Sequence, residues 1–490
     1  MTIPFPYRLN DPALLRTHAY INGQWVDTDA HFPIHNPADG TLLAQVANLG
    51  VVATEQAIDA ANAAWPAWRA LPARKRAFFL RNWYQLILEH QQDLATLMTA
   101  EQGKPFAEAL GEITYGASFV EWFAEEAKRI EGDVLASPAS DRRLLVLKQP
   151  VGVCAAITPW NFPMAMITRK IAPALAAGCT ILIKPAEQTP LSALALAELA
   201  HRAGIPAGVL NVLTADAEQS IAVGKTLCAS PIVRKLTFTG STEVGRILMQ
   251  QSAPTIKKLS LELGGHAPFI VFDDADLYAA VEGAVQSKYR NAGQTCICTN
   301  RFYVHTTLYE AFVEKYSARV AQLHVGNGFA PSTQIGPLID DAAVAKVQRH
   351  VSDAIEKGAR VTVGGARDAN GPRFFQPTVL ADVNPDMHIM REETFGPVAA
   401  VMRFDSEAEV IYQANDTDYG LAAYFYARDI SRVWRVAEAL EYGMVGVNTG
   451  QMSNEISPFG GVKQSGLGRE GSRYGMDEFL EIKYVCMGGI

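Results

Sequence analysis

The chain has 490 residues, more than one hydrophobic core usually organises, so we expect two or three domains. Hydrophobic residues make up 49% of the chain and charged residues 19%, which is typical of a packed globular enzyme and argues against a disordered protein. The formal net charge is -8 without a basic cluster, so a nucleic-acid partner is not expected.

Neither a targeting segment nor a membrane span is expected. Residues 1–10 lack the basic stretch and apolar run of a signal peptide. The best apolar run, 171–183, is shorter than the ~18 residues of a membrane span. Cys154, Cys179 and Cys486 lie in strand-like runs and are predicted to be small core residues, and the six cysteines show no zinc-type spacing. We therefore expect a cytoplasmic protein with no metal site and no membrane partner.

The first third of the chain is predicted to be helical, and an alternation of strands and helices follows. Apolar residues recur every three to four positions in 53–70, 73–101 and 104–129. The alternation predicts a parallel sheet covered by helices, and a second block with the same rhythm runs from about 268 to 459. In the first block the predicted strands are 151–157, 180–183, 209–213 and 235–239 and the predicted helices are 191–203, 219–227 and 244–251; residues 480–487 form a terminal strand.

The first predicted strand is followed by a Pro-Trp-Asn-Phe-Pro segment, 159–163, where Pro163 suits the first turn of a helix. The side-chain N–H of Asn161 could point at a developing oxyanion. An asparagine in this place is more often a helix cap, which is the structural alternative.

Phe162, Met166 and Arg169 are spaced four and three residues apart and are predicted to share one helix face. An arginine on such an apolar face needs an anionic partner. Arg290, which could reach the same pocket, also carries the guanidinium fork that binds carboxylates at two points. We interpret both arginines as ligands of a substrate carboxylate and place Arg169 ahead of Arg290; the alternative for each is a structural ion pair.

Two glycine patterns are candidates for phosphate binding. The segment 466–471 fits the dinucleotide fingerprint in spacing only, because no strand–helix–strand unit follows it. The segment 240–245 follows a predicted strand and opens a helix, so backbone N–H groups and the helix dipole can face a phosphate. Lys184 ends another strand, and Glu187, three residues later, would by itself be an ordinary helix-start acid.

Two segments carry groups suited to covalent catalysis. Glu262 lies in an apolar run, so burial is expected to raise the pKa of its carboxyl toward neutrality, as a general base requires; a salt-bridged glutamate is the alternative. Cys296 follows a predicted helix, 276–289, on a turn that contains glycine, where a thiolate would attack an aldehyde carbon. Taken alone, Cys296 and Cys298 would be interpreted as buried structural cysteines.

Five short motifs together resemble the aldehyde dehydrogenase superfamily in order and spacing, and the resemblance covers nearly the whole chain. Within the superfamily the chain is most similar to the succinate-semialdehyde dehydrogenases, through 167–170, 289–293 and 466–471. The family usually has Asn where this chain has His266, which we interpret as a packing variant rather than a group that tunes the pKa of Glu262. The five motifs are 159–163, 238–242, 261–265, 293–296 and 393–397.

The resemblance implies an α/β fold with three parts. A Rossmann-type NAD-binding domain would comprise residues 1–131 and 150–264, and an α/β catalytic domain residues 265–464. A small β oligomerisation element, residues 132–149 and 465–490, would join subunits into a dimer or a tetramer by extending a sheet.

The resemblance also implies a mechanism and a cofactor. Cys296 would attack the aldehyde, the Asn161 side chain and the Cys296 backbone N–H would hold the oxyanion, and Glu262 would activate the water that hydrolyses the thioester to a free acid. Glu187 would accept hydrogen bonds from the adenosine ribose and repel a 2′-phosphate, so NAD is expected and NADP is possible. The other implied cofactor residues are Trp160, Lys184, Gly240, Ser241, Gly245, Glu393 and Phe395.

The implied substrate is an aldehyde with a terminal carboxylate. Residues that match Arg169, Arg290 and Ser453 hold this carboxylate in succinate-semialdehyde dehydrogenases, and Phe162 and Phe459 are expected to wall the aldehyde tunnel. Succinate semialdehyde ranks first and glutarate semialdehyde second, because one methylene is worth only ~1–3 kcal/mol of discrimination. An inactive protein that retains the fold is an alternative of another class, against which the intact catalytic residues argue.

Some members of this subfamily close a disulfide between the cysteines that match Cys296 and Cys298. The resemblance therefore implies Cys298 as a redox switch, with reversible loss of activity under oxidants as its signature. The alternative is that Cys298 packs within its loop.

Overall fold

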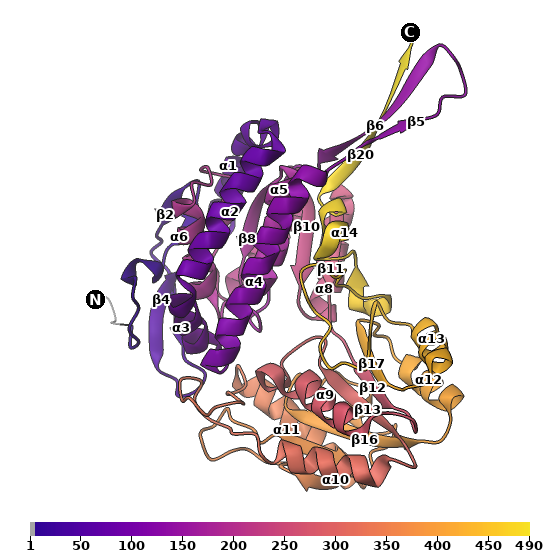
Figure 1. Ribbon diagram of the computed structural model, residues 1–490. Helices are drawn as coiled ribbons and strands as arrows, with labels where there is room; N and C mark the ends of the chain where they lie inside the picture. The colour runs from indigo at the N-terminus through magenta and orange to yellow at the C-terminus, as the bar shows by residue number, and fades with distance from the viewer. Residues whose placement is uncertain (1–4) are drawn as a thin grey trace.

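Two β-sheets, each covered by helices, form two lobes, and a β arm projects from the first of them (Figure 1). The computed structural model describes residues 5–490; residues 1–4, with which we expected the cofactor domain to begin, lie outside the described part. The lobes bury separate apolar cores around an eight-stranded and a seven-stranded sheet. Among residues 5–490, every helix is too short or too polar to traverse a membrane.

The first lobe contains the eight-stranded sheet, in the order β19-β11-β10-β7-β8-β9-β1-β2. Its central strands run parallel, as the predicted alternation of strands and helices requires, and antiparallel strands complete both edges. The strands are β1 (Ala19–Ile21), β2 (Gln24–Val26), β7 (Val153–Ile157), β8 (Thr180–Lys184), β9 (Leu210–Val212), β10 (Val233–Thr239), β11 (Lys258–Glu262) and β19 (Gly466–Leu467). The helices are α1 (Val51–Ala70), α2 (Ala73–Glu89), α3 (Gln91–Gln102), α4 (Phe106–Glu126), α5 (Ala165–Ala177), α6 (Pro190–Arg202), α7 (Ala217–Ala229) and α8 (Thr242–Ser252), and β3 (His31–His35) pairs with β4 (Leu42–Ala47).

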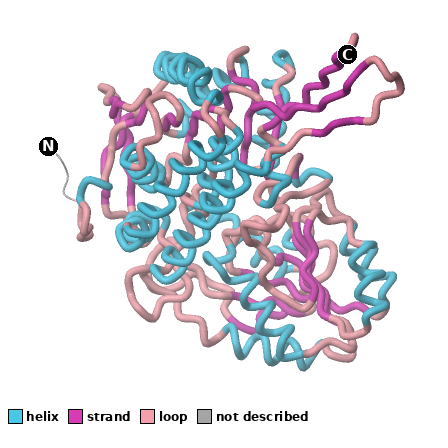
Figure 2. The backbone as a smooth tube through the Cα atoms, turned by 45° about the horizontal axis from the view of Figure 1, so that its top comes forward, coloured by secondary structure: helices cyan, strands magenta, loops and turns pink. Residues whose placement is uncertain are grey.

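The second lobe contains the seven-stranded sheet, in the order β14-β15-β16-β13-β12-β17-β18, with helices on both of its faces (Figure 2). Only its edge strand β14 runs antiparallel to its neighbour within this sheet. The strands are β12 (Ala267–Val271), β13 (Thr299–His305), β14 (Arg360–Val363), β15 (Thr378–Ala381), β16 (Val398–Phe404), β17 (Ala422–Tyr426) and β18 (Met444–Val447). The helices are α9 (Leu277–Tyr289), α10 (Tyr309–Val320), α11 (Asp341–Glu356), α12 (Glu407–Asn415) and α13 (Ile430–Ala439).

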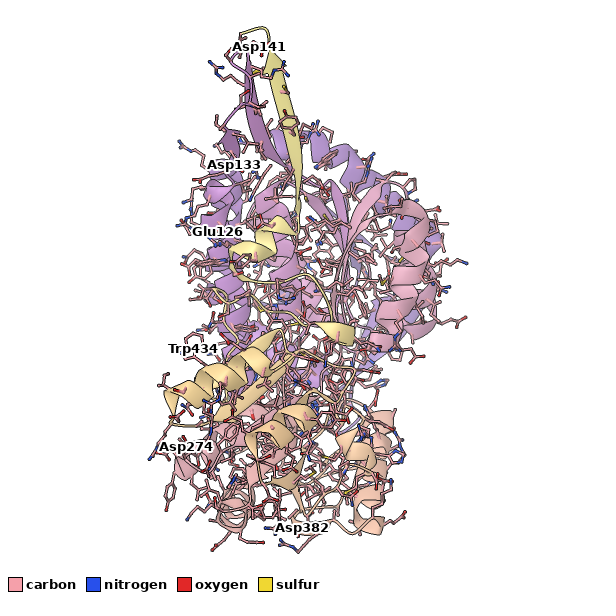
Figure 3. The ribbon with its side chains drawn as sticks, turned by 90° about the vertical axis from the view of Figure 1, so that its right-hand side faces the viewer. Glu126, Asp133, Asp141, Asp274, Asp382 and Trp434 are labelled. Atoms are coloured by element: carbon pink, nitrogen blue, oxygen red, sulfur yellow. The ribbon has the colours of Figure 1, made fainter. Side chains whose placement is uncertain are left out.

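A third, antiparallel sheet forms the arm, in which β6 (Arg142–Pro150) pairs with β5 (Asp133–Leu135) and β20 (Leu480–Gly488). Asp141 lies near the tip of the arm (Figure 3). Cys486 on β20 is exposed, so the prediction that it is a core residue was wrong: β20 leaves the body of the lobe and pairs only with β6.

Part of the segment expected in the oligomerisation element lies on the first lobe instead. β19 pairs with β11 in the eight-stranded sheet, and α14 (Ser472–Asp477) contacts α4 and α5. Of residues 465–490, only β20 extends the arm. The glycine pattern 466–471 thus forms a sheet edge and does not open a phosphate-binding helix.

The first third differs from the prediction at a break between helices and in its two N-terminal hairpins, β1–β2 and β3–β4. The predicted helix 73–101 is two helices, α2 and α3, which meet at His90 (φ -103°, ψ 17°), and both keep the apolar spacing, so periodicity alone hides the break. We did not predict the hairpin of β1 and β2, although its Asn22-Gly23 turn is a strong hairpin signal. Both turn residues have the positive φ (50° and 75°) that such a turn needs.

Adjacent parallel strands bring the predicted cofactor and catalytic segments to one edge of the first sheet. β11, β10, β7 and β8 are neighbours, and their carboxyl ends lead into Glu262, Gly240, the segment 158–164 and Lys184. Open parallel sheets bind ligands at this edge. The order of the strands therefore predicts that a cofactor and the catalytic residues meet there.

Candidate active site

A cavity of about 300 Å³ lies between the two lobes and brings most of the predicted site residues together. The predicted residues that line it are Trp160, Asn161, Phe162, Arg169, Gly240, Ser241, Arg290, Cys296, Glu393, Phe395, Ser453 and Phe459. The predicted residues outside its wall are Lys184, Glu187, Gly245, Glu262 and Cys298.

The loop that carries Cys296 has a backbone conformation that few residues adopt. Asn291, Ala292 and Gly293 have φ of 51°, 55° and 74°, and the left-handed region costs roughly 1–3 kcal/mol for a residue other than glycine. A Cβ at Gly293 would collide with the carbonyl oxygen of Gly396. The backbone N–H of Asn291 donates to Glu108 Oε2 (2.9 Å), which helps to hold this conformation. The loop is therefore fixed by its surroundings and presents Cys296 half-buried at the cavity wall.

Burial raises the pKa of the Cys296 thiol to about 12, although the nearby Arg169 cation opposes the shift. A group with this pKa is protonated at neutral pH. Because the thiolate is the nucleophile, attack requires that a base accept the Cys296 proton.

The side chain of Asn161 is oriented by the Cys296 loop. Asn161 Nδ2 donates to the backbone oxygen of Gln294 (3.0 Å), and the Asn161 backbone oxygen accepts from Asn291 Nδ2 (2.9 Å) and Lys104 Nζ (2.7 Å). An amide nitrogen carries two protons, so one remains for an oxyanion in the cavity that Asn161 lines. The helix-cap alternative is wrong, because the Asn161 side chain caps no helix.

Helix α5 begins two residues later than Pro163 predicts, at Ala165, because a distant residue caps it. Glu112 Oε1 on α4 accepts hydrogen bonds from the backbone N–H groups of Met164 (3.0 Å) and Ala165 (3.2 Å), and its other oxygen pairs with Lys104. Phe162 therefore precedes the helix and does not share its face, although it lines the same cavity as Met166 and Arg169. Sequence reasoning missed Glu112 and Lys104, because neither has a local signal.

Glu262 ends β11 with its side chain buried, 3% exposed, and neither carboxylate oxygen accepts a hydrogen bond within residues 5–490. Burial, reinforced by the nearby Glu470, raises its pKa well above the usual value, against the opposing charges of Arg169 and Lys170. This is the desolvated carboxylate that a general base requires. The salt-bridge alternative is not supported, because no ion pair joins Glu262 to a described residue. The side chain has to turn to reach the cavity.

The start of α8 fits an anionic cofactor. Gly240 follows β10, and Ser241 caps the helix by accepting a hydrogen bond from the backbone N–H of Val244 (3.3 Å). A Cβ at Gly245 would collide with Leu263, so glycine allows the helix to pack closely on the sheet. A separate cavity of about 330 Å³ opens here and is lined by three cations and four carboxylates: Arg246, Lys346, Arg391, Glu243, Glu392, Glu393 and Asp418. The backbone N–H groups and the helix dipole at the start of α8 fit a pyrophosphate.

Two of the other predicted cofactor residues lie at the carboxyl end of β8, and three line the cavity that contains Cys296. Lys184 ends β8, and its Nζ is 3.4 Å from Glu187 Oε2. Glu393 accepts a hydrogen bond from the backbone N–H of Gly265 (3.0 Å), and burial raises its pKa to about 7. Phe395 has a φ of 54°, and its ring meets Trp160 edge-on with centroids 5.6 Å apart.

The anionic partner that Arg169 requires lies within the protein. Arg169 Nη2 is 2.7 Å from Glu470 Oε2, and the guanidinium carbon lies 3.9 Å from the centre of the Phe459 ring. The neighbouring Lys170 pairs with the other oxygen of Glu470. Arg169 thus forms the structural ion pair that was the alternative to substrate binding, although it also lines the cavity.

Arg290, unlike Arg169, has no carboxylate within ion-pair distance among residues 5–490. Its guanidinium lies over the Phe162 ring at 4.6 Å and lines the cavity. Ser453, the third predicted carboxylate ligand, shares a hydrogen bond with the Tyr115 hydroxyl. Of the three predicted ligands, Arg290 is the cation left for an anionic substrate.

The sequence profile of the aldehyde dehydrogenase family matches residues 25–485. This chain belongs to that family. It is an oxidoreductase that acts on a small aldehyde, and the family uses NAD or NADP.

Relatives of this aldehyde dehydrogenase have anionic substrates in their names. The chain is 62% identical over 483 residues to an Escherichia coli succinate-semialdehyde dehydrogenase named for NADP(+), covering 98% of this chain and 100% of the relative. It is 61% identical to a Pseudomonas aeruginosa glutarate-semialdehyde dehydrogenase, covering 99% and 100%. The crystal structure of a Burkholderia pseudomallei succinate-semialdehyde dehydrogenase matches with a TM-score of 0.97 at 60% identity, covering 98% and 100%.

His266, the departure from the usual family motif, is buried in this aldehyde dehydrogenase. Burial and the nearby Arg301 hold its pKa well below the usual value, so the ring is neutral at pH 7. Its ring lies 6.2 Å from that of Tyr419, and it is not among the charges that shift the pKa of Glu262. The packing interpretation is favoured.

Cys298 faces away from the cavity in this aldehyde dehydrogenase. Its Sγ donates to the backbone oxygen of Gly293 (3.1 Å) and lies 3.8 Å from Lys288 Nζ. Both Cys296 and Cys298 are free thiols in the structure. The redox switch stays a prediction, and a disulfide would require Cys298 to leave these contacts.

Proposed function

We propose that this aldehyde dehydrogenase oxidises an ω-semialdehyde with a terminal carboxylate, succinate semialdehyde first, to the dicarboxylic acid. The observation that supports this proposal most is the Arg290 guanidinium, which has no ion-pair partner among residues 5–490 and lines the cavity that also contains Cys296 and Asn161. Arg290 is partly exposed at the cavity wall, and a substrate carboxylate could accept two hydrogen bonds from its guanidinium. The names of two relatives, which specify succinate and glutarate semialdehydes, support the same class of substrate.

The cavity residues, together with Glu262 at the end of β11, have the groups that an acyl-enzyme mechanism needs. Once its proton has passed to water, Cys296 Sγ adds to the aldehyde carbon, and Asn161 Nδ2 with the Cys296 backbone N–H stabilises the oxyanion. A nicotinamide held by the proposed cofactor residues would supply the hydride acceptor for oxidation of this adduct to the thioester. Glu262 then removes a proton from water, which attacks the thioester, releases the acid and restores the thiol.

Replacing Arg290 by Gln is expected to weaken binding of the carboxylated substrate selectively. Loss of a hydrogen bond to a charged group should raise KM for succinate semialdehyde by roughly 10- to 100-fold. KM for butanal, which has the same chain length but no carboxylate, should change little. Steady-state kinetics with both aldehydes measures this, with Arg428→Gln at an exposed arginine as the matched control. An equal rise in KM for both aldehydes would show that Arg290 has a structural role.

We propose NAD rather than NADP as the preferred cofactor. Glu187 is partly exposed near the end of β8, where a carboxylate would repel a 2′-phosphate. The Escherichia coli relative is named for NADP(+), so this preference requires a direct test.

Glu187→Ser should shift the ratio of kcat/KM for NAD and NADP by tenfold or more toward NADP, which is on the order of 1.4 kcal/mol. The variant removes the repulsion between the Glu187 carboxylate and the 2′-phosphate, and it frees Lys184 to bind that phosphate. Glu218→Ser, at an exposed acid of the same lobe, is the control. If the wild type already prefers NADP, or if the ratio does not move, the proposed role of Glu187 is refuted.

We also propose that the chain forms a dimer or a tetramer through the arm. Val134 and Ile482 on the arm are 76% and 73% exposed, and β5 and β20 are sheet edges. Exposed apolar side chains beside free strand edges favour pairing with another subunit.

A further inference from the structure

We propose that Tyr115, on α4, is a further substrate-binding residue that donates a hydrogen bond to the far carboxylate of the substrate. This inference rests on the proposed function, because it assumes that the substrate carries that carboxylate. It adds a helix to the pocket that the sequence analysis treated only as an apolar packing element.

A second cavity, of about 270 Å³, adjoins the one that contains Cys296. The two cavities share four wall residues: Tyr115, Phe162, Arg290 and Ser453. Three of these carry hydrogen-bond donors, and the fourth places an aromatic ring against the Arg290 guanidinium. The shared wall is therefore a junction that combines one cation with two hydroxyl groups, as a carboxylate receptor does.

The two hydroxyl groups at the junction are linked to each other. The Tyr115 hydroxyl and Ser453 Oγ form a hydrogen bond, in which only one of the two protons is used. The other hydroxyl proton is free to be donated, and Arg290 supplies further donors beside it. A carboxylate accepts about four hydrogen bonds, so with Ser453 Oγ donating to the Tyr115 oxygen it can accept the free Tyr115 proton together with those of the guanidinium.

The position of the Tyr115 ring is fixed by its neighbours. The ring meets Phe119, one helical turn later, edge-on with centroids 5.0 Å apart. Gly111, one turn earlier, lines the second cavity, and a Cβ there would meet no atom within 4 Å. Tyr115 is therefore held against Phe119 on one side and borders open space on the other.

The second cavity disfavours an anion that moves past the junction. Beyond the four shared residues its wall carries the carboxylates of Glu108 and Glu112. Glu112 is paired with Lys104, whereas no ion pair to Glu108 is present among residues 5–490. Like charges repel, so an anionic tail is stabilised at the junction and destabilised beyond it. The junction thus limits the distance between the aldehyde carbon and the carboxylate of the substrate.

The test is the variant Tyr115→Phe, which removes the hydroxyl and keeps the ring against Phe119. KM for succinate semialdehyde and the inhibition constant of succinate should each rise about tenfold. Turnover of succinate semialdehyde should change by less than about twofold, and butanal and butyrate should be unaffected. Tyr412→Phe, at a tyrosine that is 73% exposed, is the matched control. The proposal is overturned if KM for succinate semialdehyde and the inhibition constant of succinate do not change, or if KM for butanal rises by the same factor.

A second variant separates direct binding from support of Ser453. If Tyr115 contacts the carboxylate, Tyr115→Phe in a Ser453→Ala background raises KM further; if Tyr115 only orients Ser453, it adds nothing, and the proposal fails. A wild type that oxidises butanal as well as succinate semialdehyde would refute the proposed function itself. A wild type that prefers succinate semialdehyde, with an unaffected Tyr115→Phe variant, would refute only the role of Tyr115.

Discussion

Cys296→Ala is expected to reduce kcat by a factor on the order of 10⁴ or more, because Cys296 is the only thiol among the described residues that line the cavity, and covalent catalysis then has no nucleophile. The variant should still bind NAD and should keep its melting temperature, since the lost group is one sulfur atom at a cavity wall. Stopped-flow and steady-state assays of nicotinamide reduction measure the effect.

The matched control is Cys486→Ala, which removes an exposed thiol on the arm, far from the cavity, and should retain full activity. Labelling with an alkylating reagent at raised pH should modify Cys296 faster than at neutral pH, because burial raises its pKa to about 12. Substantial dehydrogenase activity in Cys296→Ala would contradict a thioester on this residue.

Glu262→Gln is expected to separate the two halves of the reaction. Acyl transfer to Cys296 should proceed in a burst of one reduced nicotinamide per active site, whereas the steady-state rate should fall by roughly 10²- to 10⁴-fold, because glutamine cannot accept a proton from water. The thioester should then accumulate, and mass spectrometry of the Cys296 peptide should detect it.

The pH dependence of the wild type gives an independent measure of the same residue. Burial raises the pKa of Glu262 well above its usual value, so the carboxyl is protonated and inactive as a base below this raised pKa. The deacylation rate should therefore rise as the pH increases through that pKa, and Glu262→Gln should lose this rising limb. A variant without a burst, or with an unchanged pH profile, would assign water activation to another group.

The elements around the site could be predicted where a short segment of the sequence carries the pattern that determines them. The Gly240 turn follows a strand of apolar residues and opens a helix, and both features are visible in one short segment. The non-helical pattern around Cys296 showed that it lies in a loop, whereas its role as the nucleophile was implied by the five motifs together. The turn of the β1 and β2 hairpin was missed although Asn22-Gly23 marks it, so that error was avoidable.

The remaining features depend on contacts between distant segments. Arg169 needs an anion, but nothing near it in the chain indicates that Glu470 provides one. In the same way, Glu112 caps α5 from another helix, so no local residue predicts where that helix begins. Tyr115 lies in a helix whose apolar spacing predicts packing, and only the fold shows that one face of this helix borders the cavity.

The most direct test of the account is the ratio of kcat/KM for succinate semialdehyde and butanal in the purified enzyme with NAD. Two-point binding of a carboxylate by Arg290 predicts a ratio on the order of 100 or more in favour of succinate semialdehyde. Including glutarate semialdehyde in the same assay identifies which carboxylated aldehyde is the better substrate. A ratio near one would contradict the proposed substrate class, and only the assignment to the aldehyde dehydrogenase family would stand.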